Sequence, residues 1–82
     1  MDQSRSQILK AFGYLIKQRR IQQGISQEEL GFRANLDRTY ISGLERGVRN
    51  PSLTALVSLA KGLGISVSSL LDALEVEASN IE

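Results

Sequence analysis

The sequence contains no cysteine and no histidine, and these two absences remove most of the usual parts of a catalytic or metal site. Without cysteine, neither a disulfide framework nor a thiolate metal site can form. Without histidine, the commonest metal ligand and the usual general base are both missing. Paired catalytic groups and a phosphate-binding glycine loop are not evident either. We therefore expect no enzyme, no metal site and no cofactor.

Long apolar runs are also lacking, since the longest fall far short of the roughly 20 residues that a membrane-spanning helix needs. Residues 1–6 have no apolar core and no small-residue cleavage pattern, which argues against a secretory signal. We expect a cytoplasmic protein with no membrane partner. The 82 residues, of which 41% are hydrophobic, are enough for one small core, so we expect residues 1–82 to form a single domain.

Charge is nearly balanced overall but unevenly distributed along the chain. The net charge is +1, yet all ten lysines and arginines lie in residues 5–61, together with only five acidic residues in residues 1–61. From residue 62 onward there are four acidic residues and no basic one, so the two parts carry +5 and −4. A basic body with an acidic end suits a protein that presents one face to phosphate. A chance distribution of surface charge is the alternative.

Apolar residues recur at helical spacing and predict an all-α chain of five helices. The first helix runs from about residue 6 to 23 and ends before Gly24. Ser26 and Glu29 form a capping box that begins a second helix over residues 27–34. The three remaining helices follow the N-cap candidates Asp37, Ser52 and Ser66, and Gly47 and Gly64 end the third and fourth.

The apolar side chains of these helices predict one core. We expect the fourth helix to bury one face, formed by Leu53, Leu56, Val57, Ala60 and Leu63. From the fifth helix we assign Leu71 to the core. The polar tail over residues 75–82 is expected to fray.

Residues 26–46 have the spacing of a helix-turn-helix unit, two short helices joined by a tight turn. Gly31 provides a position without a side chain where the two helices approach each other. Asn35, four residues later, tolerates the left-handed conformation that the turn requires. Ile41 and Leu44 then supply the apolar contacts that fix the crossing of the helices.

Several segments resemble the Cro/C1-type helix-turn-helix family of phage and bacterial repressors, also called the XRE type. The resemblance covers about residues 12–71 and rests on RIQQGISQEEL at 20–30, YISGLERG at 40–47, RNPSL at 49–53 and LGISV at 63–67. The segment DRTYISGLER at 37–46 is more narrowly similar to the controller proteins of restriction-modification systems. Asn35 departs from the family, which usually has glycine there. The resemblance implies a five-helix, lambda-repressor-like DNA-binding fold.

The resemblance also implies which side chains contact bases. The first exposed residues of the third helix are Arg38 and Thr39, and Ser42 and Gly43 follow one turn later. Arginine can bind guanine O6 and N7 together, and the threonine methyl group can contact thymine. The alternative for Arg38 is a solvated arginine at a helix start, which the helix dipole disfavours.

Five further residues are candidates for contact with the DNA backbone: Gln27, Tyr40, Arg46, Arg49 and Asn50. Gln27 begins the second helix, whose free N–H groups can hold a phosphate, although it could equally be an ordinary first-turn residue. The hydroxyl of Tyr40 could donate to phosphate, or its ring could pack half-buried against the second helix.

Arg20 and Glu45 are implied by the resemblance to be structural. In the phage repressors, residues at these positions form an internal ion pair between the first and third helices. We therefore expect an Arg20–Glu45 pair rather than DNA contacts.

One such domain reads only a few base pairs, so the resemblance implies a homodimer on a palindromic operator in double-stranded DNA. We take Val67, Leu70 and Leu74 as candidates for the dimer face, although each could instead close the monomer core. The acidic end would then lie away from DNA. RNA polymerase is a further candidate partner.

The function implied is a sequence-specific transcription regulator, of the controller type, that acts on its own promoter. A phage- or plasmid-type repressor and the antitoxin of a toxin–antitoxin pair are alternatives with the same fold. A helix-turn-helix used only for protein interaction is disfavoured by Arg38 and Arg49.

Overall fold

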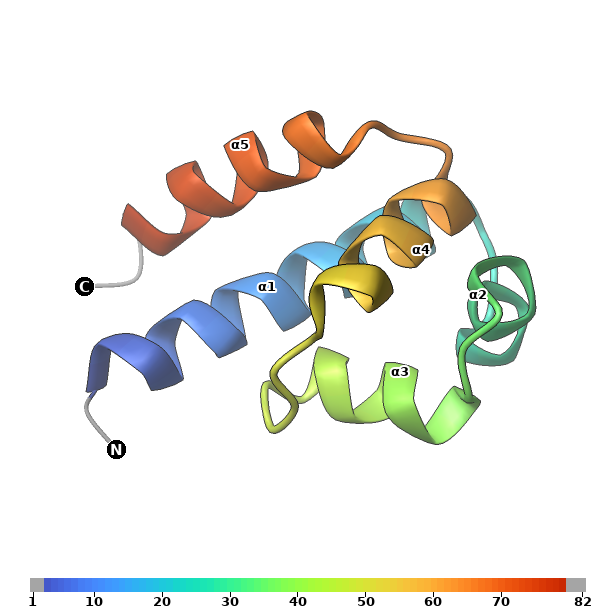
Figure 1. Cartoon of the computed structure of the whole chain (residues 1–82), viewed down its shortest axis with the longest axis horizontal. Helices are drawn as coiled ribbons and strands as arrows, with labels where there is room; N and C mark the ends of the chain where they lie inside the picture. The colour runs from blue at the N-terminus through green and yellow to red at the C-terminus, as the bar shows by residue number, and fades with distance from the viewer. Residues whose placement is uncertain (1–2, 80–82) are drawn as a thin grey trace.

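The computed structural model describes residues 3–79, and this part of the chain consists of five helices without a strand (Figure 1). They are α1 (Gln3–Gln22), α2 (Gln27–Ala34), α3 (Arg38–Glu45), α4 (Leu53–Leu63) and α5 (Val67–Ser79). The predicted all-α class is confirmed, and the predicted bounds of the second helix agree with α2. The first helix begins earlier than expected, at Gln3 instead of about residue 6.

Three of the four predicted serine and aspartate caps are formed. The hydroxyls of Ser26, Ser52 and Ser66 accept hydrogen bonds from backbone N–H groups three residues later, at 2.9, 3.1 and 3.0 Å. Asp37 occupies the N-cap position of α3, but its carboxylate makes no capping bond. The N–H of Tyr40 donates instead to the backbone oxygen of Asp37 at 3.0 Å, which leaves the carboxylate without that role.

The core lies between all five helices. Its buried apolar members come from every element: Phe12, Ile16, Leu30, Ile41, Leu44, Leu59, Ala60, Leu63 and Leu70. The predicted buried stripe of α3, Ile41 and Leu44, is confirmed.

The predicted face of α4 is partly wrong, because Leu53 and Val57 are exposed while Ala55 and Leu59 are buried. The reason is the close packing of α4 against α2, where a Cβ on Gly62 would lie 3.1 Å from the Cβ of Ala34. Ala55, Leu59 and Gly62 share one helical face, and this face turns inward. Since α4 is apolar on most sides, its composition alone leaves the choice of face open.

On α5 the roles of two neighbouring leucines are the reverse of those expected. Leu70 is fully buried in the core and cannot belong to a dimer face, whereas Leu71 is 43% exposed and is not a core residue. Val67 and Leu74 are partly buried and pack against the core. Helix α5 continues to Ser79, past the expected start of fraying at residue 75, and residues 80–82 lie outside the described residues.

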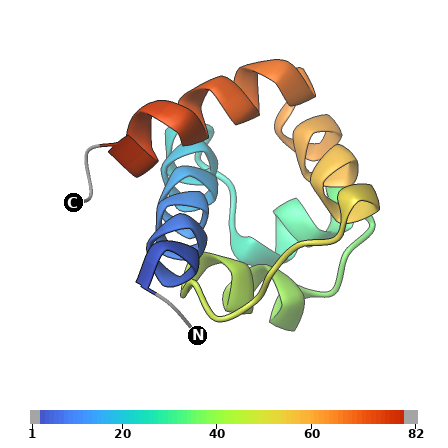
Figure 2. The same ribbon diagram turned by 60° about the vertical axis from the view of Figure 1, so that its left-hand side comes forward.

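The arrangement places α3 and α5 on opposite sides of the molecule. Helix α5 lies along one side of α1, and α3 lies at the other side (Figures 1 and 2). The first turn of α3 is exposed at Arg38 and Thr39. Within residues 3–79, no single helix is long and apolar enough to cross a bilayer; α4 and α5 reach that length and composition only together, and they are bent by 102°.

Candidate nucleic-acid interface

The turn between α2 and α3 is built on Gly31 and Asn35, as the sequence predicted. Asn35 adopts the left-handed conformation, with φ 56° and ψ 44°. The N–H of Leu36 donates to the backbone oxygen of Gly31 at 2.8 Å. A Cβ on Gly31 would lie only 2.6 Å from the backbone oxygen of Leu36. The close approach is therefore made by the turn itself rather than by the body of α3.

A nearly buried ion pair joins α1 to α3. The guanidinium of Arg20 donates from Nε and Nη2 to the two carboxylate oxygens of Glu45, at 2.7 and 3.0 Å. The two side chains are only 13% and 4% exposed. Arg20 also donates to the backbone oxygen of Ile25 at 3.0 Å, so the same side chain holds the loop before α2. The predicted structural pair is confirmed, and it fixes α3 relative to the rest of the fold.

Hydrogen bonding to Glu45 raises the pKa of Arg20 above the ordinary value for arginine, against the opposing effect of burial. A raised pKa for a cation means that folding favours the charged form. This contribution of Arg20 to stability is lost only as the pH rises through the raised value, well above the neutral range. The orientation of α3 is therefore held by this pair throughout the neutral range.

Gln27 belongs to the same network, which the sequence did not indicate. Its Nε2 donates to Oε1 of Glu45 at 3.1 Å, so the side chain is anchored to α3. An amide nitrogen has two hydrogens, and the second can still donate to a phosphate oxygen. A structural contact is thus present at Gln27, and its predicted phosphate contact remains compatible with it.

The first turn of α3 carries the exposed candidates Arg38 and Thr39. Within residues 3–79 no hydrogen bond or ion pair to Arg38 is found, so its guanidinium donors are available. Ser42, one turn later, is half-buried, and its hydroxyl accepts a hydrogen bond from Nε of Arg46 at 3.4 Å. This long contact places the side chain of Arg46, just after α3, beside Ser42.

Gly43 is not an exposed member of this surface, contrary to the prediction. It is buried, and a Cβ added to it would lie 2.6 Å from Cγ of Arg49. The guanidinium carbon of Arg49 lies 5.5 Å from the centre of the Tyr40 ring. The half-buried Tyr40 and the exposed Arg49 are therefore neighbours, and Asn50 follows on the exposed loop.

A family model described as helix-turn-helix matches residues 16–70, which include all of α2, α3 and α4. The chain belongs to the helix-turn-helix family. Members of this family are DNA-binding transcription regulators rather than enzymes.

Several similar proteins are controller proteins of restriction-modification systems, one group within the helix-turn-helix family. Control protein C.BamHI of Bacillus amyloliquefaciens is 45% identical over 62 residues, which cover 74% of this chain and 76% of that protein. Control protein C.MunI of Mycoplasma sp is 42% identical over 67 residues, covering 80% and 90%. The solved structure of the controller protein C.Esp1396I, a tetramer in complex with its 35 base-pair operator, matches with a TM-score of 0.82 and 38% identity over 89% of this chain and 96% of that one.

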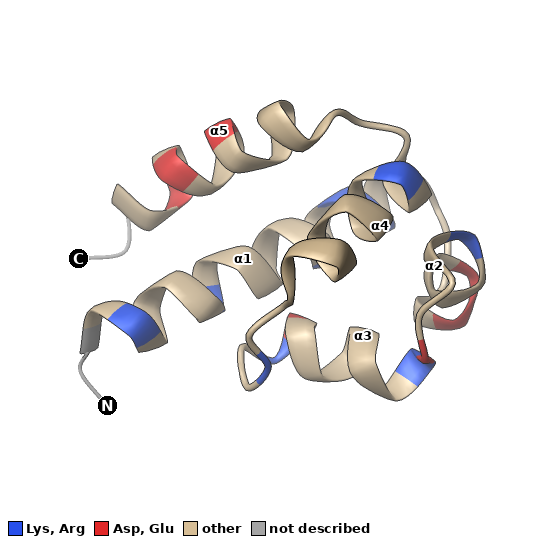
Figure 3. Cartoon of the chain, viewed as in Figure 1, with Lys and Arg blue, Asp and Glu red and all other residues tan. Residues whose placement is uncertain are grey.

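Charged residues of this helix-turn-helix protein are unevenly placed on its surface. Basic residues lie at the start of α3 and in the loop that follows it, whereas the acidic residues of α5 lie on the opposite side (Figure 3). Acidic residues also lie on α2 and directly before α3, so the difference between the two sides lies in the basic residues near α3 and the lack of basic residues on α5. The face that carries α3 is the one suited to phosphate.

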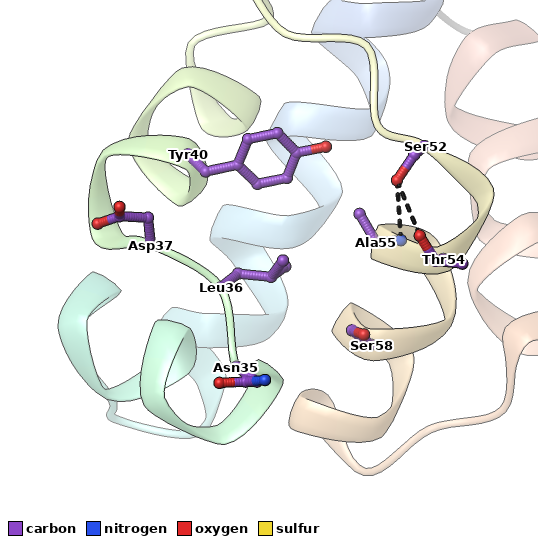
Figure 4. A pocket seen from close by; sticks show the side chains of 8 residues that line it. All are labelled: Asn35, Leu36, Asp37, Tyr40, Ser52, Thr54, Ala55 and Ser58. Carbon is purple, nitrogen blue, oxygen red and sulfur yellow. Dashed lines mark hydrogen bonds between the residues drawn. The ribbon is translucent and has the colours of Figure 1, made fainter.

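A hollow of about 390 Å³ lies beside the recognition helix α3, between its first turn and the start of α4 (Figure 4). Tyr40 lines it from α3, and Ser52 and Thr54 from α4. The two hydroxyls are 3.2 Å apart, and that of Ser52 also caps α4. The hollow thus lies at the junction of two helix starts.

Proposed function

We propose that this chain is a sequence-specific transcription regulator of the restriction-modification controller type, which binds its own operator as a homodimer. The observation that carries the proposal is the uncovered first turn of α3. There Arg38 and Thr39 are exposed on a helix whose orientation is held by the nearly buried Arg20–Glu45 pair. A rigidly held helix with free donors suits the reading of base edges in the major groove.

In the proposed complex, Arg38 donates two hydrogen bonds to a guanine, and Thr39 and Ser42 contact neighbouring bases. Arg46, Arg49 and Asn50, on the loop after α3, contact the backbone. Phosphate contacts set the register of the protein on the duplex, and base contacts supply the specificity.

The remaining backbone contacts come from Gln27 and Tyr40. Gln27 donates its second amide hydrogen to phosphate from the start of α2, while its first stays with Glu45. For Tyr40, the half-buried ring leaves the hydroxyl as the group that reaches the DNA backbone.

A homodimer follows from the amount of DNA that one domain can read. Two copies would place their α3 helices in half-sites about 34 Å apart, one turn of the duplex. The operator complex of C.Esp1396I, in which four copies bind 35 base pairs, supports symmetric assembly on DNA.

For the dimer face we propose a set of α5 residues that differs from the predicted one. Leu70 is replaced by Leu71, which is partly exposed and lies one or two helical turns from Val67, Leu74 and Ala78 on the same side of the helix. We propose this stripe as the surface that a second copy covers.

The controller type implies how regulation would work. Low occupancy of an operator upstream of the chain's own gene activates transcription through RNA polymerase, and high occupancy represses it. Such a circuit delays the production of a restriction enzyme. It also implies a cytoplasmic location, where the promoter DNA lies.

Selection from a random-sequence DNA library by the purified chain tests the proposal. We expect enrichment of a symmetric motif whose half-sites are about 10 base pairs apart, as helix-turn-helix dimers require. Failure to enrich any sequence would overturn the proposal that the chain binds DNA sequence-specifically.

The controller assignment needs a second measurement, on a reporter placed behind the DNA upstream of the chain's own gene. Expression that rises and then falls with increasing protein supports a controller. A fall at every dose would instead indicate a simple repressor. Neutralisation of a toxin encoded beside the gene, without any effect on the reporter, would indicate an antitoxin.

A further inference from the structure

Arg49 is seated on α3 by two residues that lie one turn apart. Its aliphatic Cγ occupies the space that a side chain on Gly43 would fill, with 2.6 Å to an added Cβ. Its guanidinium carbon is 5.5 Å from the centre of the Tyr40 ring. Residues three apart in a helix share a face, so the ring and the bare backbone form one continuous seat.

The seat holds Arg49 without using its hydrogen-bond donors. A cation above an aromatic ring is attracted by the charge distribution of the ring face, and no N–H group needs an acceptor there. Within the described residues, no hydrogen bond or ion pair to Arg49 is found. All five guanidinium donors therefore remain for an acceptor outside the chain.

We propose that Tyr40 and Gly43 are positioning residues that hold Arg49 in its DNA-binding orientation before DNA is bound. Gly43 then acts through Arg49 instead of touching a base. This inference rests on the proposed function, because DNA is the acceptor that Arg49 would meet. Ordering a long side chain in advance reduces the entropy lost on binding, so the seat raises affinity without adding a contact to DNA.

The first test uses the free protein and needs no DNA. Ring currents from Tyr40 should shift the NMR signals of the Arg49 Cδ protons upfield. Tyr40→Phe should keep this shift, whereas Tyr40→Leu and Gly43→Ala should remove it. Unshifted Arg49 signals in the wild type would overturn the seat, whatever the protein binds.

The second test is a double-mutant cycle on the operator that the wild type selects. Gly43→Ala should weaken binding about two- to fivefold, the range of an exposed cation–π contact. In an Arg49→Ala background, Gly43→Ala should cause no further loss. Tyr40→Phe removes only the hydroxyl and should keep the contribution of Arg49. Measured against Tyr40→Phe, Tyr40→Leu should behave like Gly43→Ala. Thermal unfolding of each variant shows that any loss of binding is not a loss of folding.

The outcomes separate the two proposals. Equal losses from Gly43→Ala with and without Arg49 would show that Gly43 meets DNA directly, and would overturn the positioning role alone. A wild type that selects no DNA would overturn the proposed function, while the NMR shift would still decide whether the seat exists.

Discussion

The arginines around α3 differ in what holds their side chains, and this difference divides their roles. Arg20 is bound to Glu45 in the interior, and Arg46 donates to Ser42 on the surface. Arg49 rests on Tyr40, and Arg38 has no hydrogen bond or ion pair within residues 3–79. A free guanidinium at the positive end of a helix dipole is unfavourable on its own, so an acceptor outside the chain accounts for Arg38 best.

At this scale we predict that Arg38→Ala weakens binding to the selected operator by about 1–3 kcal/mol, the discrimination of one bidentate arginine–guanine contact. Binding to random DNA should fall much less. Fluorescence anisotropy on both DNAs measures the two losses.

Lys61→Ala is the matched control for Arg38→Ala, because it removes the same charge from the last turn of α4 instead of the first turn of α3. It should change both affinities only slightly. An equal loss on operator and random DNA for Arg38→Ala would mean that Arg38 meets phosphate rather than a base.

At the scale of elements, the helix-turn-helix unit depends on a contact between a glycine and a backbone oxygen. The space beside Gly31 is closed by the oxygen of Leu36, which belongs to the turn and cannot move independently. The space beside Gly43 is closed only by the flexible side chain of Arg49. Gly31 and Gly43, which both lie inside helices, are therefore required for different structural reasons.

Gly31→Ala should destabilise the fold by about 1–2 kcal/mol, because the clash with the turn exceeds the gain in helix propensity. Gly43→Ala should instead be neutral or stabilising by up to about 1 kcal/mol, since Arg49 can move aside. Urea unfolding followed by circular dichroism compares them. A Gly31→Ala variant as stable as the wild type would contradict the close approach at the turn.

At the scale of the whole molecule, the exposed sides of α3 and α5 face opposite directions and carry different kinds of side chain (Figures 1 and 3). The side with α3 carries basic residues at the start of that helix and in the loop after it. Helix α5 combines acidic residues with the partly exposed Leu71, which fits a surface that meets a second copy instead of phosphate.

Leu71→Glu should shift the chain from dimer to monomer in sedimentation equilibrium and leave its helical content unchanged. Val76→Glu is the control, because Val76 is 64% exposed on another face of α5. It should leave the dimer intact. A dimer that survives Leu71→Glu would contradict the proposed stripe.

The sequence by itself determined the features that depend on neighbours along the chain. The five helices, the serine caps, the left-handed Asn35 and the helix-turn-helix family could all be predicted, since they follow from hydrogen bonds and steric limits within a few residues. The Arg20–Glu45 pair was also predicted, through the resemblance to the family.

Only the tertiary structure decided how each helix is rotated about its own axis and which distant residues meet. Leu70 rather than Leu71 enters the core because the packing of α5 on α1 selects one of two adjacent apolar positions. Gln27 reaches Glu45, and Arg49 covers Gly43, across gaps in the chain that no local pattern spans. Helical periodicity gives a helix its apolar positions, whereas the choice among them is made by the shape of the neighbours that bury them.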